Sequence, residues 1–229
     1  MRASNSAGEI GSVPTVPNLL HLDSSADLRR SRSRALTARF AETWRALGPD
    51  HLVTRRDLHR DQLPHLPDAD LHWPPRLRPA DAAVPEAAET LQRELIDELL
   101  AADVLLVGAG LYNYSLPSTL KAWVDYIHVP GVTTPFDGPT QPLAGRPAVV
   151  VTSQGLAYDE GSPTAGWDHE VPVLEIVLGT ALGMAVSVVT APLALAATLP
   201  ALADQRERAE TEYAAALETV AALARELGR

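Results

Sequence analysis

A chain of 229 residues with 46% hydrophobic and 21% charged residues is long enough for one sizeable core, and we expect a single soluble domain. No apolar run approaches the roughly 18 residues of a membrane span, and the net charge of −10 argues against a general nucleic-acid binder. The absence of cysteine excludes disulfides, thiolate nucleophiles and cysteine-bound metals, and a cytoplasmic location explains it most simply.

The chain begins with a polar segment, which a strand, a turn and a helix follow. Met1–Pro17 contains no apolar stretch of the kind found in secretory signals, so we predict a flexible extension over residues 1–17 and one domain over residues 18–229. Asn18–Asp23 is typical of a short buried strand, and a serine-rich turn comes next. From Ser31 onward, apolar side chains recur at helical spacing, at Leu36, Phe40, Trp44 and Leu47.

A long irregular segment joins the second strand to the second helix. His51–Leu58 predicts a strand near the edge of a sheet, and Pro85–Ala102 predicts a helix. His59–Pro85 between them is rich in proline, which is typical of a functional loop or of an excursion that covers one end of a sheet. We predict no metal site there, because the candidate ligands lack a regular spacing: His59, His65, Asp68, Asp70 and His72.

The second half of the chain alternates strands and helices. Asp103–Gly110 is uniformly apolar, which predicts a central parallel strand buried on both faces. The remaining elements are a helix over Pro117–Ile127, a strand over Ala148–Gly155, a helix over Asp168–Leu182, a strand over Ala185–Ala191 and a long helix from about Ala201. This order predicts an α/β fold, a parallel sheet with helices on both faces.

Ligands of such sheets bind outside the carboxyl ends of the strands, where the strand order reverses. Three segments are therefore candidates for the site: Asp23–Ser33, Gly110–Ser115 and Ser153–Tyr158. Common motifs are absent from them. Asn113 stands where a G-x-G-x-x-G fingerprint needs its last glycine, the single lysine of the chain, Lys121, lies in no P-loop, and Ser153 lacks the preceding glycine of a hydrolase elbow.

The three segments together fit flavin mononucleotide (FMN). The first offers Ser24, Ser25, Ser31 and Ser33 at the start of a helix, where hydroxyls and free amides bind phosphate without a lysine, and Arg29, Arg30 and Arg32 add positive charge. Tyr112, Asn113 and Tyr114 supply aromatic faces and polar groups for a planar ring, and Ser153, Gln154 and Gly155 supply donors and a close backbone approach. Taken singly, each segment is more often an ordinary helix cap, packing tyrosine or turn, and the interpretation depends on all three occurring together.

The same segments resemble the FMN-dependent NADH-azoreductase family, which is related to the NAD(P)H:quinone oxidoreductases. The resemblance lies in Ser25 with "SRS" at Ser31–Ser33, in "LYNYSLPSTLKAWVDYI" from Leu111, in "GVTT" at Gly131–Thr134, in "SQGL" at Ser153–Leu156 and in "GWDHEVPVLEIVLGTALGM" from Gly166. It covers about residues 18–220 in the same order. It implies a flavodoxin-like, doubly wound, five-stranded parallel sheet of order 2-1-3-4-5.

The resemblance also implies how the cofactor is held. Phosphate contacts fall on Ser25, Ser31, Arg32 and Ser33, and ring contacts fall on Leu111, Tyr112, Asn113, Tyr114, Ser153, Gln154, Gly155 and Leu156. Chemistry on FMN requires no obligatory acid or base, and the candidate proton donors are Tyr112, Tyr158 and His169. Gln154 and Leu156 replace an arginine and a glycine of the family, which favours a quinone-like or polycyclic aromatic acceptor over simple azo dyes.

The implied activity is ping-pong reduction of a small aromatic acceptor by NADH or NADPH in a homodimer, with hydride passing through flavin N5. A specialised biosynthetic pathway is one setting for such a reaction. Two other functions fit the sequence: a flavodoxin-like FMN electron carrier, and a flavin-free relative recruited to a redox-neutral reaction.

Overall fold

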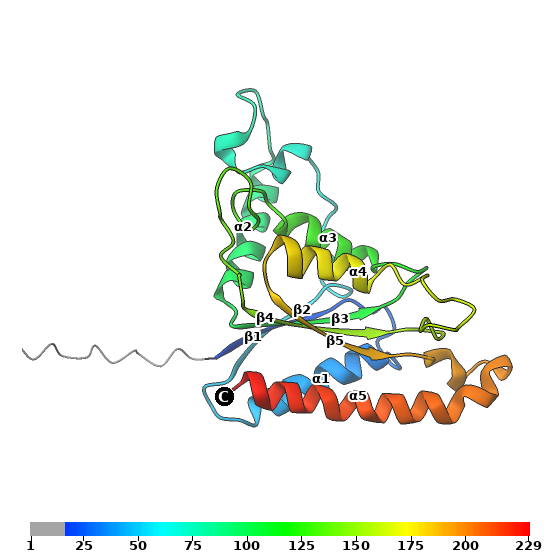
Figure 1. The fold of residues 1–229 in the computed structure, drawn as a ribbon. Helices are drawn as coiled ribbons and strands as arrows, with labels where there is room; N and C mark the ends of the chain where they lie inside the picture. The colour runs from blue at the N-terminus through cyan, green and yellow to red at the C-terminus, as the bar shows by residue number, and fades with distance from the viewer. Residues whose placement is uncertain (1–16) are drawn as a thin grey trace, which may run out of the picture.

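Five parallel strands form one sheet of order β2-β1-β3-β4-β5 in the computed structural model, which describes residues 17–229 (Figure 1). The strands are β1 (Asn18–Asp23), β2 (Leu52–Asp57), β3 (Val104–Gly110), β4 (Pro147–Ser153) and β5 (Ala185–Ala191). Both the predicted fold class and the strand order are confirmed. The predicted extension lies outside the described residues except for Pro17, whose carbonyl accepts a hydrogen bond from the Leu52 amide.

Helices cover both faces of the sheet (Figure 1). The helices α1 (Arg32–Arg45) and α5 (Arg206–Leu227) lie on one face, and α2 (Glu86–Ala101), α3 (Ser118–Ile127) and α4 (Val171–Leu174) lie on the other. Because side chains alternate along a strand, each strand feeds two separate cores. In β1, Leu19 belongs to the core with α1 and α5, whereas Leu20 belongs to the core with α2 and α3. All seven residues of β3 are buried, as expected for a central strand.

Two helices differ from the sequence prediction. The last helix begins at Arg206, because Pro200–Gln205 forms a 3₁₀ segment (η5) that contains a non-helical Leu202 with φ −112° and ψ 18°. The helix predicted over Asp168–Leu182 is divided into the short α4 and a π-helical segment, η3 (Glu175–Ala181).

The proline-rich excursion between β2 and α2 extends away from the sheet on the α2 side and contains the 3₁₀ turns η1 (Ala69–His72) and η2 (Pro75–Leu77) (Figure 1). It is anchored at Leu71, which is fully buried and whose carbonyl accepts a hydrogen bond from Gln92. Asp68 caps η1 by accepting the Asp70 amide at 2.8 Å. Within residues 17–229 no three His, Asp or Glu side chains are grouped to hold a metal ion, and no helix there is long and apolar enough to cross a membrane.

Candidate functional site

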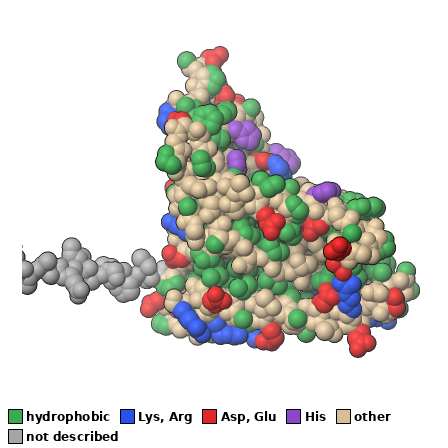
Figure 2. All heavy atoms as spheres, in the orientation of Figure 1, with side chains coloured by type: hydrophobic (Ala, Val, Ile, Leu, Met, Phe, Trp, Pro, Cys, Tyr) green, Lys and Arg blue, Asp and Glu red, His purple; other side chains and the backbone are tan. Residues whose placement is uncertain are grey.

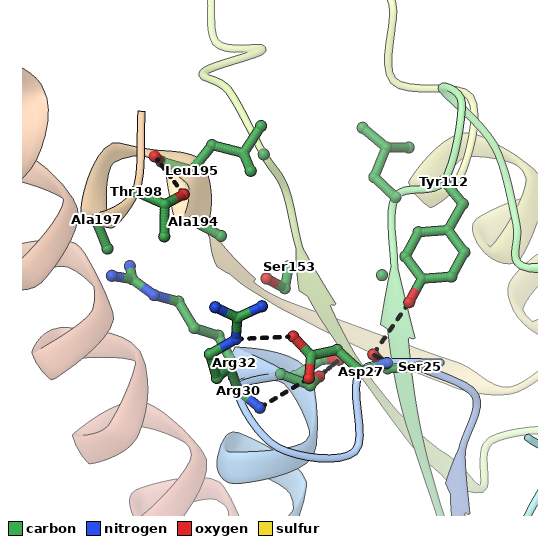
Figure 3. Close-up of a pocket in the computed structure, with 15 residues that line it drawn as sticks. Ser25, Asp27, Arg30, Arg32, Tyr112, Ser153, Ala194, Leu195, Ala197 and Thr198 are labelled. Atoms are coloured by element: carbon green, nitrogen blue, oxygen red, sulfur yellow. Dashed lines mark hydrogen bonds and ion pairs between the residues drawn. The ribbon is translucent and has the colours of Figure 1, made fainter. Parts of the chain in front are cut away.

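A pocket of about 400 Å³ opens at the carboxyl ends of β1, β3 and β4, and we call it the strand-end pocket (Figure 3). Its volume falls within the range of small-molecule sites. Eight of the residues expected to bind the cofactor line it: Ser25, Ser31, Arg32, Ser33, Leu111, Tyr112, Ser153 and Gly155. The topology therefore brings one part of each predicted segment to a common cavity. We call these segments the first loop (Asp23–Ser33), the second loop (Gly110–Ser115) and the third loop (Ser153–Tyr158).

The N-terminus of α1 forms the polar end of the strand-end pocket. Ser31 is its N-cap, and its hydroxyl accepts the Arg34 amide at 3.2 Å and lies 3.1 Å from the Ser33 hydroxyl. The amides of Arg32 and Ser33 belong to the first turn, where amides have no partner within the helix. Hydroxyls, first-turn amides and the positive end of the helix dipole together suit an anion.

Arginine side chains near this end of the pocket are already paired. The Arg32 guanidinium donates to the Ala209 carbonyl and to Glu210 at 3.0 and 2.6 Å, and it lies 4.7 Å from the centre of the Tyr213 ring. Arg30 also lines the pocket, and its Nε lies 3.7 Å from Oδ2 of Asp27. Asp27 is itself a lining residue, which the sequence prediction missed. Arg32 therefore lines the pocket while its guanidinium is bound to α5.

The Leu111–Tyr114 segment divides into a part inside the pocket and a part outside it. The Tyr112 hydroxyl lies 3.2 Å from the Ser25 hydroxyl and accepts the Ala26 amide at 2.9 Å, so it joins the first and second loops (Figure 3). Asn113 and Tyr114 have φ of 49° and 70° and form the centre of a two-residue reversal closed by hydrogen bonds between Tyr112 and Ser115. Such primed turns require positive φ at both central residues. Neither Asn113 nor Tyr114 lines the pocket.

The third loop is divided in the same way. Ser153 and Gly155 line the pocket, but Gln154 is buried on the other side of the loop, where its amide nitrogen donates to Asp168 at 2.7 Å. Leu156 lines a separate cavity. Ser153 and Gln154 differ because extended backbone at the end of β4 directs successive side chains to opposite sides.

A fourth wall, which the sequence analysis missed, comes from the segment after β5. Its lining residues belong to or follow the 3₁₀ turn η4 (Ala194–Ala197), and they lie across the pocket from Tyr112 (Figure 3): Ala194, Leu195, Ala197 and Thr198. The Ala194 and Leu195 amides donate to the Gln154 and Gly155 carbonyls at 2.9 and 3.1 Å. The available signal was topological, since the end of β5 reaches the same edge of the sheet.

The structure separates the three candidate proton donors. Tyr112 lines the pocket, whereas Tyr158 lines a neighbouring cavity and His169 is tied to the second loop by its amide, which donates to the Tyr114 carbonyl at 2.9 Å. Burial, with smaller contributions from Tyr114 and Asp168, raises the pKa of Tyr158, so its hydroxyl keeps its proton at neutral pH.

Glu170 is a buried acid that the sequence analysis did not single out. It is fully buried before α4, Thr152 donates a hydrogen bond to its Oε2, and its Oε1 has no protein partner. Burial raises the pKa of Glu170 to about 8, and the nearby Asp168 adds to the effect. A neutral carboxylic acid at pH 7 therefore lies beneath the third loop.

Comparisons with known proteins agree with this architecture. The family model described as "Flavodoxin-like fold" matches residues 17–220. An "FMN-dependent NADH:quinone oxidoreductase" of Kineococcus radiotolerans is 59% identical over 214 residues, which cover 93% of this chain and 99% of the relative. A Frankia alni protein of the same name is 41% identical over 206 residues, which cover 87% of this chain and 97% of the relative.

Solved structures extend the likeness to the fold. An azoreductase from Bacillus anthracis superposes with a TM-score of 0.75 at 21% identity, covering 92% of this chain and 99% of the other. The family match spans most of the chain, and the 59% identical relative is matched over nearly its whole length. This chain therefore belongs to the flavodoxin-like family that includes the FMN-dependent NADH:quinone oxidoreductases.

Proposed function

We propose that this protein is an FMN-dependent oxidoreductase that uses NADH or NADPH to reduce a quinone, azo or polycyclic aromatic acceptor. The observation that carries the proposal is the strand-end pocket, which has the N-terminus of α1 at one end and the Tyr112 and Gly155 loops beside it. The names of the two relatives support the same activity. When bound, FMN would supply the redox chemistry between the nicotinamide co-substrate and the acceptor.

The residues present fit FMN. The hydroxyls of Ser25, Ser31 and Ser33 and the first-turn amides of α1 would hold the phosphate, and no lysine is needed. Tyr112 fixes the first loop against the second through its hydroxyl, and Gly155 lets the third loop approach a planar ring closely. The chain binds and orients the cofactor, and none of its side chains needs to act as an obligatory acid or base.

We also propose a cytoplasmic homodimer. The dimer is supported by apolar side chains at the surface: Figure 2 shows hydrophobic side chains exposed among polar ones on the face between the excursion and the α1–α5 layer. Large apolar side chains that remain exposed in the single chain include Tyr114, Phe136, Trp167 and Ile176. Of these, Tyr114 and Trp167 contact each other, with ring centroids 5.4 Å apart, and exposed aromatic side chains that cluster mark interaction sites in soluble proteins. Sedimentation equilibrium tests the dimer, and a monomer at micromolar concentration contradicts it.

Reconstitution with FMN tests the proposal. The purified protein mixed with FMN should retain one yellow flavin per chain through gel filtration, and it should bleach when NADH or NADPH is added under anaerobic conditions. Retention without bleaching identifies an electron carrier, and a colourless protein contradicts flavin binding altogether.

A charge placed at the phosphate end sharpens the test. Ser31→Asp puts a carboxylate beside the proposed phosphate and should abolish FMN retention. Thr219→Asp, on the exposed side of α5, adds the same charge far from the pocket and should leave retention unchanged. Equal retention by the two variants would place the phosphate elsewhere.

A further inference from the structure

Arg34 binds the backbone of the first loop without lining the strand-end pocket. Arg34 lies in the first turn of α1, its side chain is only 12% exposed, and it does not line the pocket. Its Nε and Nη2 both donate to the carbonyl oxygen of Ser25, at 2.9 and 2.7 Å. Two donors on one carbonyl fix the position of that peptide more firmly than a single hydrogen bond does.

The same guanidinium is held by a carboxylate from the neighbouring strand. Asp57 at the end of β2 accepts Arg34 Nη1 and Nη2 at 2.7 and 2.8 Å, a two-point pairing. Asp57 is buried and also accepts the amides of His59 and Arg60 at 3.2 Å. Burial alone would raise the pKa of Asp57, but the hydrogen bonds from Arg34 reverse that effect and hold the pKa below its usual range.

These contacts link the end of β2 to the loop that carries the serines. Ser25 lies between Arg34 on one side and the Tyr112 hydroxyl on the other. The Arg34 amide in turn donates to the Ser31 hydroxyl, so one residue contacts both ends of the loop. A shift of the Ser25 peptide therefore moves the Ser25 hydroxyl relative to Ser31, Ser33 and the first-turn amides of α1.

We propose that Arg34, anchored by Asp57, is a positioning residue for the phosphate end of the strand-end pocket, an inference that rests on the proposed FMN function. Arg34 acts through the geometry of the Ser25–Ser31 loop, because its guanidinium is already bound to a carbonyl and a carboxylate and does not line the cavity. Loss of this clamp weakens recognition of the phosphate and leaves contacts with the flavin ring in place.

Comparison of FMN with riboflavin isolates the phosphate, because riboflavin is the same molecule without it. The dissociation constants of both are measured by equilibrium dialysis, and their ratio reports the contribution of the phosphate. Arg34→Met keeps the apolar stem and removes the donors, and we expect the ratio to fall by about tenfold or more, the loss typical of charge-assisted hydrogen bonds. A merely structural role would weaken both ligands equally and leave the ratio unchanged, which would overturn the inference.

Two further variants complete the experiment. Arg34→Met/Asp57→Asn removes the clamp without leaving a buried carboxylate unpaired, so it covers the case in which the single variant fails to fold, and the same fall is expected. Arg56→Met is the matched control, since Arg56 lies in the same strand and pairs with Glu94 and Glu98 at 3.0 and 2.6 Å, but its side chain pairs with neither Asp57 nor Ser25. It should keep the wild-type ratio, and an equal fall in this control also overturns the inference.

Failure of the inference is distinguishable from failure of the proposed function. If wild-type protein binds neither FMN nor riboflavin, the proposed function is wrong. If wild-type protein prefers FMN and the Arg34 variants retain that preference, the proposed function stands and the positioning role is wrong.

Discussion

Replacing Glu170 by glutamine should make the protein more stable, by an amount that depends on pH. Glu170 is fully buried, and its pKa is raised from 4.5 to about 8. Below pH 4.5 the side chain is protonated in both folded and unfolded chains, so the substitution has no ionisation effect. Between pH 4.5 and 8 only the unfolded chain loses the proton, so the stability of the wild type falls as pH rises.

The magnitude follows from the shift in pKa. Each pH unit between 4.5 and the assay pH contributes about 1.4 kcal/mol, so at pH 7 the advantage of Glu170→Gln is about 3 kcal/mol. The advantage should level off above about pH 8, where folded Glu170 is ionised as well. The glutamine carbonyl can still accept the hydrogen bond from Thr152, which keeps packing effects small.

Urea denaturation of both proteins at pH 5, 7 and 9 measures this difference directly. Glu175→Gln is the matched control, an exposed carboxyl in the next turn, and it should change stability by less than about 0.5 kcal/mol. A difference between wild type and Glu170→Gln that stays constant from pH 5 to 9, or that shrinks as pH rises, would refute a buried neutral acid.

Three other substitutions test the local geometry of the site. Ser31→Ala should lower the free energy of unfolding by about 1 kcal/mol in urea denaturation, because the Arg34 amide loses its cap; no change would contradict the capping role. Asn113→Val should cost about 1–2 kcal/mol by the same measurement, because a β-branched residue must adopt φ 49°, whereas Asn113→Gly should be tolerated. Gly155→Ala brings a Cβ to 2.9 Å from Leu195 Cδ1 and should weaken FMN binding; a double-mutant cycle with Leu195→Ala should show a coupling of about 0.5 kcal/mol or more, and additivity would exclude the contact.

Periodicity and apolar runs were sufficient to predict the sheet and its layers. Val104–Gly110 is apolar throughout, and only a strand buried on both faces suits such a run. The spacing of Leu36, Phe40 and Trp44 marked the buried face of α1, and Ser31 marked its first turn. These signals are local, since each depends on the repeat of one element and on one capping side chain.

Only the tertiary structure decided which way individual site residues face. Gln154 and Ser153 are neighbours in the sequence, yet Gln154 donates a hydrogen bond to Asp168 outside the pocket, whereas Ser153 lines the pocket. The orientation of Arg32 could not be predicted from the sequence either, because its guanidinium contacts α5 almost 180 residues away along the chain. Such directions depend on partners contributed by distant segments, which local pattern does not encode.

The sequence by itself thus determined the succession of strands and helices along the chain and the three loops at one edge of the sheet, because hydrophobic periodicity and turn residues act locally. The tertiary structure alone decided the fourth wall at Leu195, the clamp formed by Arg34 and Asp57, and the burial of Glu170. Each of these requires contacts between segments far apart in the chain, and their physical consequences arise only when packing removes water from polar groups.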